Sequence, residues 1–212
     1  MAKGKFLVTG EDYYVIDGII FDIKRQLRTK SGSPLDPQKV ISALQRIDEG
    51  KFDKFAENNI LKSLSRGESL VLDALDGIET LANAKDVFAY IDSDLINWGA
   101  DEKGPATEET SVAVYEIAKD ATFSQMFDSL SDDLNSLCLT QAQIINFVKK
   151  YRSWLRADGY ATLFLFKSHG HFFVAYVSLP SGGRLRVAVD RFGRSGVWCA
   201  GARRRLVVPQ LA

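Results

Sequence analysis

The chain has few of the residues that stabilise small secreted or metal-bound domains. Its 212 residues include two cysteines, Cys138 and Cys199, and two histidines. Two cysteines are too few for a disulfide framework, which favours a reducing environment. The segment Met1–Phe6 is basic but lacks the apolar run of a signal peptide, and no apolar stretch reaches the roughly 20 residues that cross a bilayer. We therefore expect a cytoplasmic protein without a membrane partner.

Proline is also scarce, with five residues, while 46% of the chain is hydrophobic and 25% is charged. This composition is typical of globular proteins and argues against long disordered segments. The sequence contains no internal repeat and no Walker, dinucleotide-binding or nucleophile-elbow spacing. A chain of this length forms one domain or two small ones.

The first half of the chain is predicted to be helical. A capping box at Thr9 opens a helix that runs to about Arg28. A second helix over residues 36–50 begins with an Asp-Pro pair and ends at a glycine. Within 52–98, the leucine-rich residues 61–81 favour one or two further helices, and Asp86–Trp98 is compatible with either a helix or a strand. We expect residues 1–100 to form a mainly helical region.

The second half, residues 110–212, is predicted to combine helices with a sheet. Capping boxes at Thr122 and Thr140 open two amphipathic helices, the second spanning Gln141–Arg156. β-Branched and aromatic runs separated by turn residues then predict four strands. These strands are Tyr160–Phe166, His171–Leu179, Arg184–Phe192 and Leu206–Val208. The fold class expected is α+β, with a helical N-terminal region followed by two capped helices packed on one face of a four- to five-stranded antiparallel sheet.

Several short segments of the second half form a distinctive set. They are Asp120–Phe123, Leu137–Ile144, Trp154–Tyr160, Phe164–Lys167, Phe172–Ala175 and Val207–Gln210. As a set they resemble a family of short hypothetical proteins of unknown function from uncultured candidate-phylum bacteria, over about residues 110–212. The resemblance implies no activity, cofactor or partner. In the family pattern the segment that matches Ser168–His171 is a variable polar turn, which argues against catalysis by its histidines.

Charge is unevenly distributed along the chain, although the formal net charge is zero. Residues 1–67 carry 12 basic and 9 acidic residues, residues 68–136 carry 3 and 16, and residues 137–212 carry 12 and 2. The simpler interpretation is that the acidic segment packs on the basic one and neutralises it. The alternative is that the basic segment stays free to bind a polyanion.

One candidate site is a cysteine-hydrolase triad of Cys138, His171 and Asp190, with His169 as an alternative base. The order of these residues is similar to that in papain-like hydrolases, and a helix N-terminus with an imidazole stabilises a thiolate. However, leucines flank Cys138, which is typical of a small buried side chain. Neighbouring arginines explain Asp190 as a surface salt bridge. We predict that Cys138 is not a nucleophile.

The same residues offer a second candidate, a metal site. His169 and His171 would share one face of an extended strand, where Asp190, Cys138 or Cys199 would complete the ligands of zinc or iron. The histidine pair spans a predicted turn, and the chain lacks a second paired-ligand motif. We predict no bound metal and no cofactor.

The third candidate is a basic surface on the predicted sheet. It consists of Arg184, Arg186, Arg191, Arg194, Arg203, Arg204 and Arg205 together with Trp198. Arginines interleaved with aromatic residues on a sheet bind single-stranded nucleic acid through phosphate contacts and base stacking. The simpler explanation is a solvated face whose arginines offset the acidic segment.

These observations favour a non-enzymatic interaction module with an unknown protein partner, whose contact surface is the C-terminal sheet. Cysteine hydrolysis and single-stranded nucleic-acid binding are the two alternatives. The sequence leaves the oligomeric state open.

Overall fold

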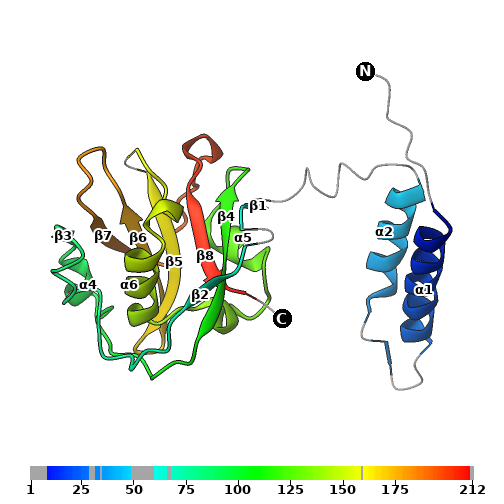
Figure 1. The fold of residues 1–212 in the computed structure, drawn as a ribbon, viewed down its shortest axis with the longest axis horizontal. Helices are drawn as coiled ribbons and strands as arrows, with labels where there is room; N and C mark the ends of the chain where they lie inside the picture. Colours follow the sequence, from blue (N-terminus) through cyan, green and yellow to red (C-terminus); the bar gives the residue numbers. More distant parts are fainter. Residues whose placement is uncertain are drawn as a thin grey trace. The chain divides into compact units, whose positions relative to one another are not determined.

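The computed structural model describes residues 9–28, 32–33, 35–48, 60–65, 68–158 and 160–210. The chain divides into two compact units, Met1–Asn58 and Asn59–Ala212. The first unit contains two helices, and the second contains a sheet with further helices (Figure 1). The division therefore falls well before residue 100, the end of the helical region expected from the sequence.

The N-terminal unit contains helix α1, Gly10–Leu27, and helix α2, Pro37–Asp48. The capping box predicted for α1 is confirmed. The hydroxyl of Thr9 accepts a hydrogen bond from the Asp12 backbone, and the Asp12 carboxylate accepts one from the Thr9 backbone. In the described part of the chain, no helix combines the length and the apolar character that crossing a membrane requires.

The C-terminal unit is built on a mixed eight-stranded sheet (Figure 1). The strand order is β1-β4-β8-β5-β6-β7-β3, and β2 also pairs with β4. The strands are β1 (Leu61–Ser63), β2 (Leu70–Leu72), β3 (Tyr90–Ile91), β4 (Thr110–Ile117), β5 (Ala161–Ser168), β6 (His171–Ser178), β7 (Arg186–Arg191) and β8 (Arg205–Pro209). The pairs β5–β8 and β3–β7 are parallel, and the other pairs are antiparallel.

The expected sheet of four to five antiparallel strands is therefore wrong, although its four C-terminal strands are all present. Strand β8 does not continue a meander but lies between β4 and β5, parallel to β5. Strands β7 and β8 run in the same direction, so residues 192–204 form a crossover of the length that such a connection requires. Periodicity along a strand predicts that a strand exists, but it does not identify the partner.

The helices expected between residues 52 and 98 are also wrong. The described part of this segment forms β1, β2, β3 and the single-turn helix α4, Asp94–Asn97. Leu70 and Leu72 are buried while Val71 between them is half-buried, which is the alternation of a strand. Apolar runs of three residues are too short for their spacing to distinguish a strand from a helix. The part of the prediction at 52–59 lies outside the described residues.

The two capped helices cover opposite faces of the sheet, not one face as predicted. Helix α6, Gln141–Lys150, packs on the face that carries Phe164 and Phe166. Helix α5, Phe123–Asp128, packs on the other face, with Leu163 and Leu165. Six consecutive residues of β5, from Ala161 to Phe166, are buried, so both faces of this central strand need a cover.

Two short 3-10 turns complete the cover of the sheet, one on each face. The predicted helix Gln141–Arg156 ends at Lys150, and the 3-10 turn η2, Arg152–Trp154, follows it. A second 3-10 turn, η1, spans Leu134–Leu137 and lies beside α5. The capping boxes predicted at Thr122 and Thr140 are both confirmed.

The packing of α6 can be tested at Phe147, which is fully buried and contacts the rings of Tyr151 and Phe164. Phe147→Ala should lower the free energy of unfolding by about 3–5 kcal/mol, because the cavity cannot collapse between a helix and a sheet. Urea denaturation measures this difference. The matched control is Ile96→Ala, at a residue that is 67% exposed, with an expected loss of no more than about 0.5 kcal/mol. A loss under about 1 kcal/mol for Phe147→Ala would contradict the assigned packing.

Candidate nucleic-acid interface

Cys138 has the environment of a structural cysteine. It follows η1, where its thiol donates a hydrogen bond to the carbonyl oxygen of Leu134 at 3.3 Å. Its side chain is half-buried and packs with the core on the α5 face of the sheet. This burial raises the pKa of the Cys138 thiol to about 12. The thiolate that a nucleophile needs is therefore disfavoured at neutral pH.

The sheet separates the other two residues of the predicted triad. Side chains alternate between faces along a strand, so Asp190 lies on the α5 face with its neighbour Tyr176, while His171 lies on the face of Phe173 and α6. Asp190 is 9% exposed and accepts hydrogen bonds from the Tyr176 hydroxyl, at 2.6 Å, and from Arg194. Asp190 is thus a buried structural acid, and not the surface salt bridge to its flanking arginines that the sequence suggested.

Neither histidine is arranged as a metal ligand. His169 adopts a left-handed turn with φ of 46°, so His169 and His171 do not share the face of an extended strand. The imidazole of His169 lies 3.6 Å from the carboxylate of Glu102, which also accepts a hydrogen bond from the His169 backbone. Within the described ranges, no three His, Cys, Asp or Glu side chains are grouped closely enough to hold an ion.

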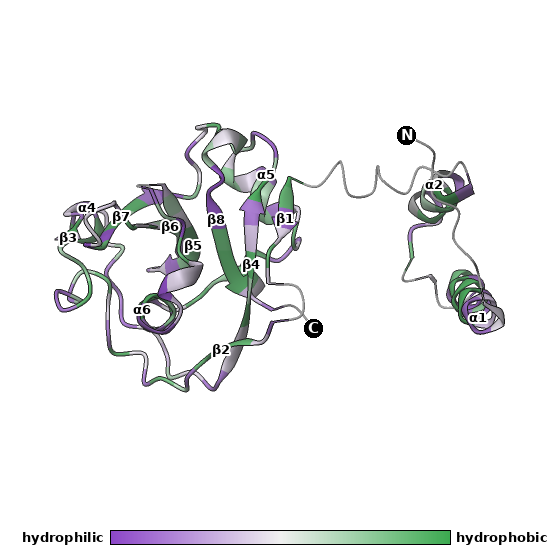
Figure 2. Ribbon diagram, turned by 45° about the horizontal axis from the view of Figure 1, so that its top comes forward, coloured by the Kyte–Doolittle hydropathy of each residue, from purple (hydrophilic) through white to green (hydrophobic). Residues whose placement is uncertain are grey.

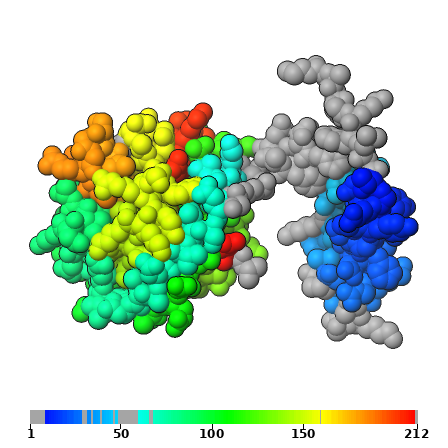
Figure 3. All heavy atoms as spheres, viewed as in Figure 1, coloured from blue at the N-terminus to red at the C-terminus, as the bar shows by residue number. Residues whose placement is uncertain are grey.

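The acidic segment does pack on the basic one, and the ion pairs between them in the described residues involve lysines of α6, while Glu116 of β4 is the cross-strand partner of Arg205. Lys149 forms ion pairs with Glu79 and Asp86, and Lys150 forms one with Asp73. Figure 3 shows the cyan and teal atoms of residues 60–100 around the yellow-green atoms of α6 on one face of the unit.

A buried amide fixes this arrangement. Gln141 is 2% exposed, accepts a hydrogen bond from the Leu81 backbone and donates to the carbonyls of Ala100 and Glu102. Both ends of the segment 81–102 are thus tied to the first turn of α6. The position of the acidic residues is set by this buried group, since exposed ion pairs contribute little.

Five of the seven arginines of the predicted set, all except Arg191 and Arg194, lie at one end of the sheet. In the strand register, Arg205 of β8 is opposite Thr162 of β5, and Arg186 of β7 is opposite Ser178 of β6, which pairs with the start of β5. Strands β5, β7 and β8 therefore begin at the same end of the sheet. We call Arg184, Arg186, Arg203 and Arg204, which lie in or just before β7 and β8, the arginine rim. Three strand spacings, about 14 Å, separate β7 from β8.

The arginine rim has no acidic partners in the described part of the chain. None of its four members takes part in an ion pair, whereas Arg194 pairs with Asp190 and Arg156 with Asp158. Arg184 and Arg186 line a pocket of about 420 Å³ together with Tyr90. Tyr90 is the register partner of Arg186 on the parallel strand β3 and is 54% exposed.

Aromatic rings lie among these arginines at the other side of the rim. The guanidinium of Arg204 lies over the ring of Trp198, at 4.7 Å, and near the ring of Tyr160, at 5.9 Å. The guanidinium of Arg156 also lies 5.4 Å from the centre of the Tyr160 ring, and Tyr160 is 41% exposed. The sequence did not indicate Tyr90 or Tyr160, because their proximity to the arginines depends on the strand order. Tyr160 was identified only as the first residue of the predicted strand Tyr160–Phe166.

Three arginines of the predicted binding set have other roles, and one of them is Arg194, which pairs with Asp190. The guanidinium of Arg205 donates hydrogen bonds to the carbonyls of Trp154 and Leu155, so it supports the end of η2. Burial lowers the pKa of this guanidinium. Arg191 is at the opposite end of β7, where its guanidinium lies 5.4 Å from the ring of Trp98.

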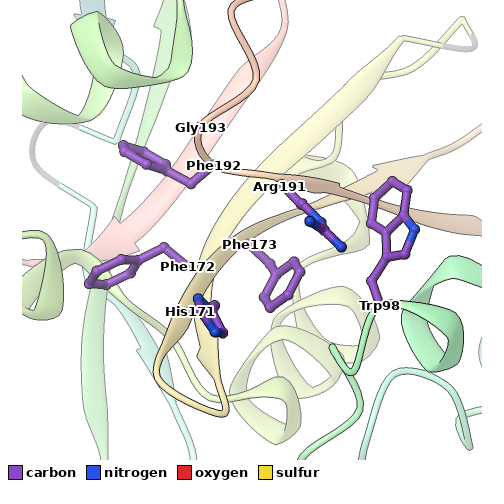
Figure 4. Close-up of a pocket in the computed structure, with 7 residues that line it drawn as sticks. All are labelled: Trp98, His171, Phe172, Phe173, Arg191, Phe192 and Gly193. Carbon is purple, nitrogen blue, oxygen red and sulfur yellow. The ribbon is translucent and has the colours of Figure 1, made fainter.

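Arg191 and Trp98 line a separate pocket of about 430 Å³ (Figure 4). Figure 4 shows Arg191 between Trp98 and Phe173, while Phe172 and Phe192 point toward the other side of the sheet. Two aromatic rings thus flank Arg191, but this pocket offers a single arginine where the arginine rim offers four. The arginine rim is the better candidate for a binding surface.

No protein-family model, curated protein or solved structure significantly matches the chain. The site must therefore be interpreted from its own chemistry.

The state of Cys138 gives a direct test of the hydrolase alternative. With a pKa of about 12, roughly one thiol in 10⁴ is ionised at pH 8, and this fraction rises about tenfold for each pH unit up to 12. In the Cys199→Ser variant, iodoacetamide should label Cys138 far more slowly than it labels the exposed Cys199 of the parent chain. Mass spectrometry of intact protein measures both rates. Fast labelling at pH 6 that His171→Ala abolishes would show an activated thiolate instead.

Proposed function

We propose that the chain is a non-catalytic module that binds single-stranded nucleic acid at the arginine rim. One observation carries this proposal. Three acidic residues of the segment pair with the lysines of α6, whereas the four rim arginines form no ion pair among the described residues. Tyr90 lines a pocket with Arg184 and Arg186, and Trp198 lies beneath Arg204. This balance favours the polyanion alternative over internal neutralisation.

The chemistry of the rim suits a single strand. Guanidinium groups contact phosphates, and an exposed aromatic ring stacks on a base that is free of a duplex. Tyr90 and Tyr160 are the half-exposed rings at the two sides of the rim. Strands β3 and β8 are four strand spacings apart, about 19 Å. A single-stranded nucleic acid that crosses this distance can contact both sides of the arginine rim.

An acidic protein surface would use the same arginines without needing the rings. The two partners are distinguished by the response to loss of an aromatic side chain, since stacking contributes about 1–3 kcal/mol per base. This comparison is part of the test.

The variant Arg184→Ala/Arg186→Ala should weaken binding of a fluorescent oligo-dT at 50 mM NaCl by tenfold or more. It should also lower the slope of log K against log salt by about 1.4, because two phosphate contacts are lost. Tyr90→Ala should weaken binding by roughly 5- to 150-fold without changing that slope. Fluorescence anisotropy of the full-length chain measures both quantities.

The control is Arg191→Ala, which removes one arginine from the other end of β7, where the rim variant removes two, and it should change affinity by less than about twofold. Three results would contradict the proposal. They are no salt-dependent binding to the parent chain, equal effects of the control and the rim variant, and an unchanged affinity in Tyr90→Ala. The last result would favour an acidic protein as the partner.

A further inference from the structure

Helix α1 is amphipathic, yet none of its side chains is buried. Val15, Ile16 and Ile19, with Tyr13 beside them, are 51–65% exposed and lie within an arc of about 160° around the helix axis, whereas Tyr14 and Phe21 lie outside it. Green, hydrophobic residues are prominent along α1 and α2 in Figure 2. In α2, Ile41, Leu44 and Ile47 are 40–46% exposed. A helix of 18 residues is marginal in water unless its apolar side is covered.

The charges of α1 argue against a membrane surface as that cover. Residues 9–28 contain four acidic and three basic residues. A helix that lies in the headgroup region carries an excess of lysine and arginine on its polar face.

The order of these charges is self-complementary when the helix is reversed. The acidic residues Glu11, Asp12, Asp17 and Asp22 precede the basic residues Lys24, Arg25 and Arg28. A second α1 placed antiparallel to the first would bring each acidic half beside a basic half. Asp22 already pairs with Arg25 within the helix, whereas Asp17 and Lys24 form no ion pair in the described residues.

Asp17 and Lys24 occupy the same flank of the apolar side. They are seven residues apart, which leaves them about 20° from each other around the helix axis. A two-fold axis near the middle of α1 therefore places Asp17 of one chain opposite Lys24 of the other, and the same contact occurs twice.

We propose that α1 mediates homodimerisation by pairing antiparallel with α1 of a second copy of this chain, with α2 of each copy extending the contact. The seven exposed side chains named above would each remove roughly 60–120 Å² from water when covered. Two copies would bury about 800–1,700 Å² in total, a range that reaches the size of a standard stable interface. This inference does not depend on the proposed function.

The charge pattern gives the sharpest test. By sedimentation equilibrium of the full-length chain, Asp17→Lys should weaken dimerisation about tenfold or more, since two attractive contacts become repulsive. Lys24→Asp should do the same. The double variant Asp17→Lys/Lys24→Asp should restore the parent affinity, because both contacts are re-formed with reversed sign.

Mixing the two single variants should give a heterodimer that is tighter than either homodimer, since every contact is then attractive. A parallel arrangement would already place like charges together in the parent chain, so the single variants would then dimerise as well as the parent. A monomeric parent chain at 100 µM, or single variants that dimerise as well as the parent, would overturn the proposal.

The apolar contact has its own matched pair of variants. Ile16→Asp introduces a charge on the apolar side and should abolish the dimer. Phe21→Asp introduces the same charge about 140° away around the helix, at a side chain that is 67% exposed, and should leave the dimer intact. Equal dimerisation of the two variants would contradict the assigned face.

Discussion

The burial of β5 on both faces is the constraint on which the C-terminal unit depends. Six consecutive buried residues cannot be covered from one side, so the chain supplies α6 on one face and α5 with η1 on the other. The neighbours of β5 are β6, which follows it directly, and β8, which returns through a crossover. The same two-sided sheet separates His171 from Asp190, and it thereby removes the hydrolase geometry that their order in the sequence suggested.

The position of the acidic segment is set by how it packs against α6 on one face of this sheet. Burial of Leu81 and Phe88 stabilises the position of the acidic segment by about 1.5–3 kcal/mol each, whereas its exposed ion pairs with α6 contribute about 0–1 kcal/mol each. Packing therefore decides where Asp73, Glu79 and Asp86 lie, which is beside α6. The arginine rim lies in or just before β7 and β8, and its arginines form no ion pair in the described residues.

The local parts of the fold were predictable from the sequence, and the parts that depend on long-range pairing were not. Three capping boxes and four C-terminal strands were correctly predicted, because cap spacing and β-branched runs act within a few residues. The three-residue strands β1 and β2 were predicted to be helices, and the segment of β3 was left open between a helix and a strand, because so short a run shows no periodicity. Tyr90 and Tyr160 were missed at the candidate site, because they approach arginines only through the order of strands in the sheet.

The central proposal is that single-stranded nucleic acid binds at the arginine rim, at the end of the sheet where β5, β7 and β8 begin. The most direct measurement is a ¹⁵N NMR titration of the full-length chain with a short oligo-dT. The account predicts shifts concentrated at Tyr90, Tyr160 and residues 184–186 and 203–204, with little change around Trp98 and Arg191. Shifts confined to the Trp98–Arg191 pocket, or the absence of shifts at low salt, would contradict it.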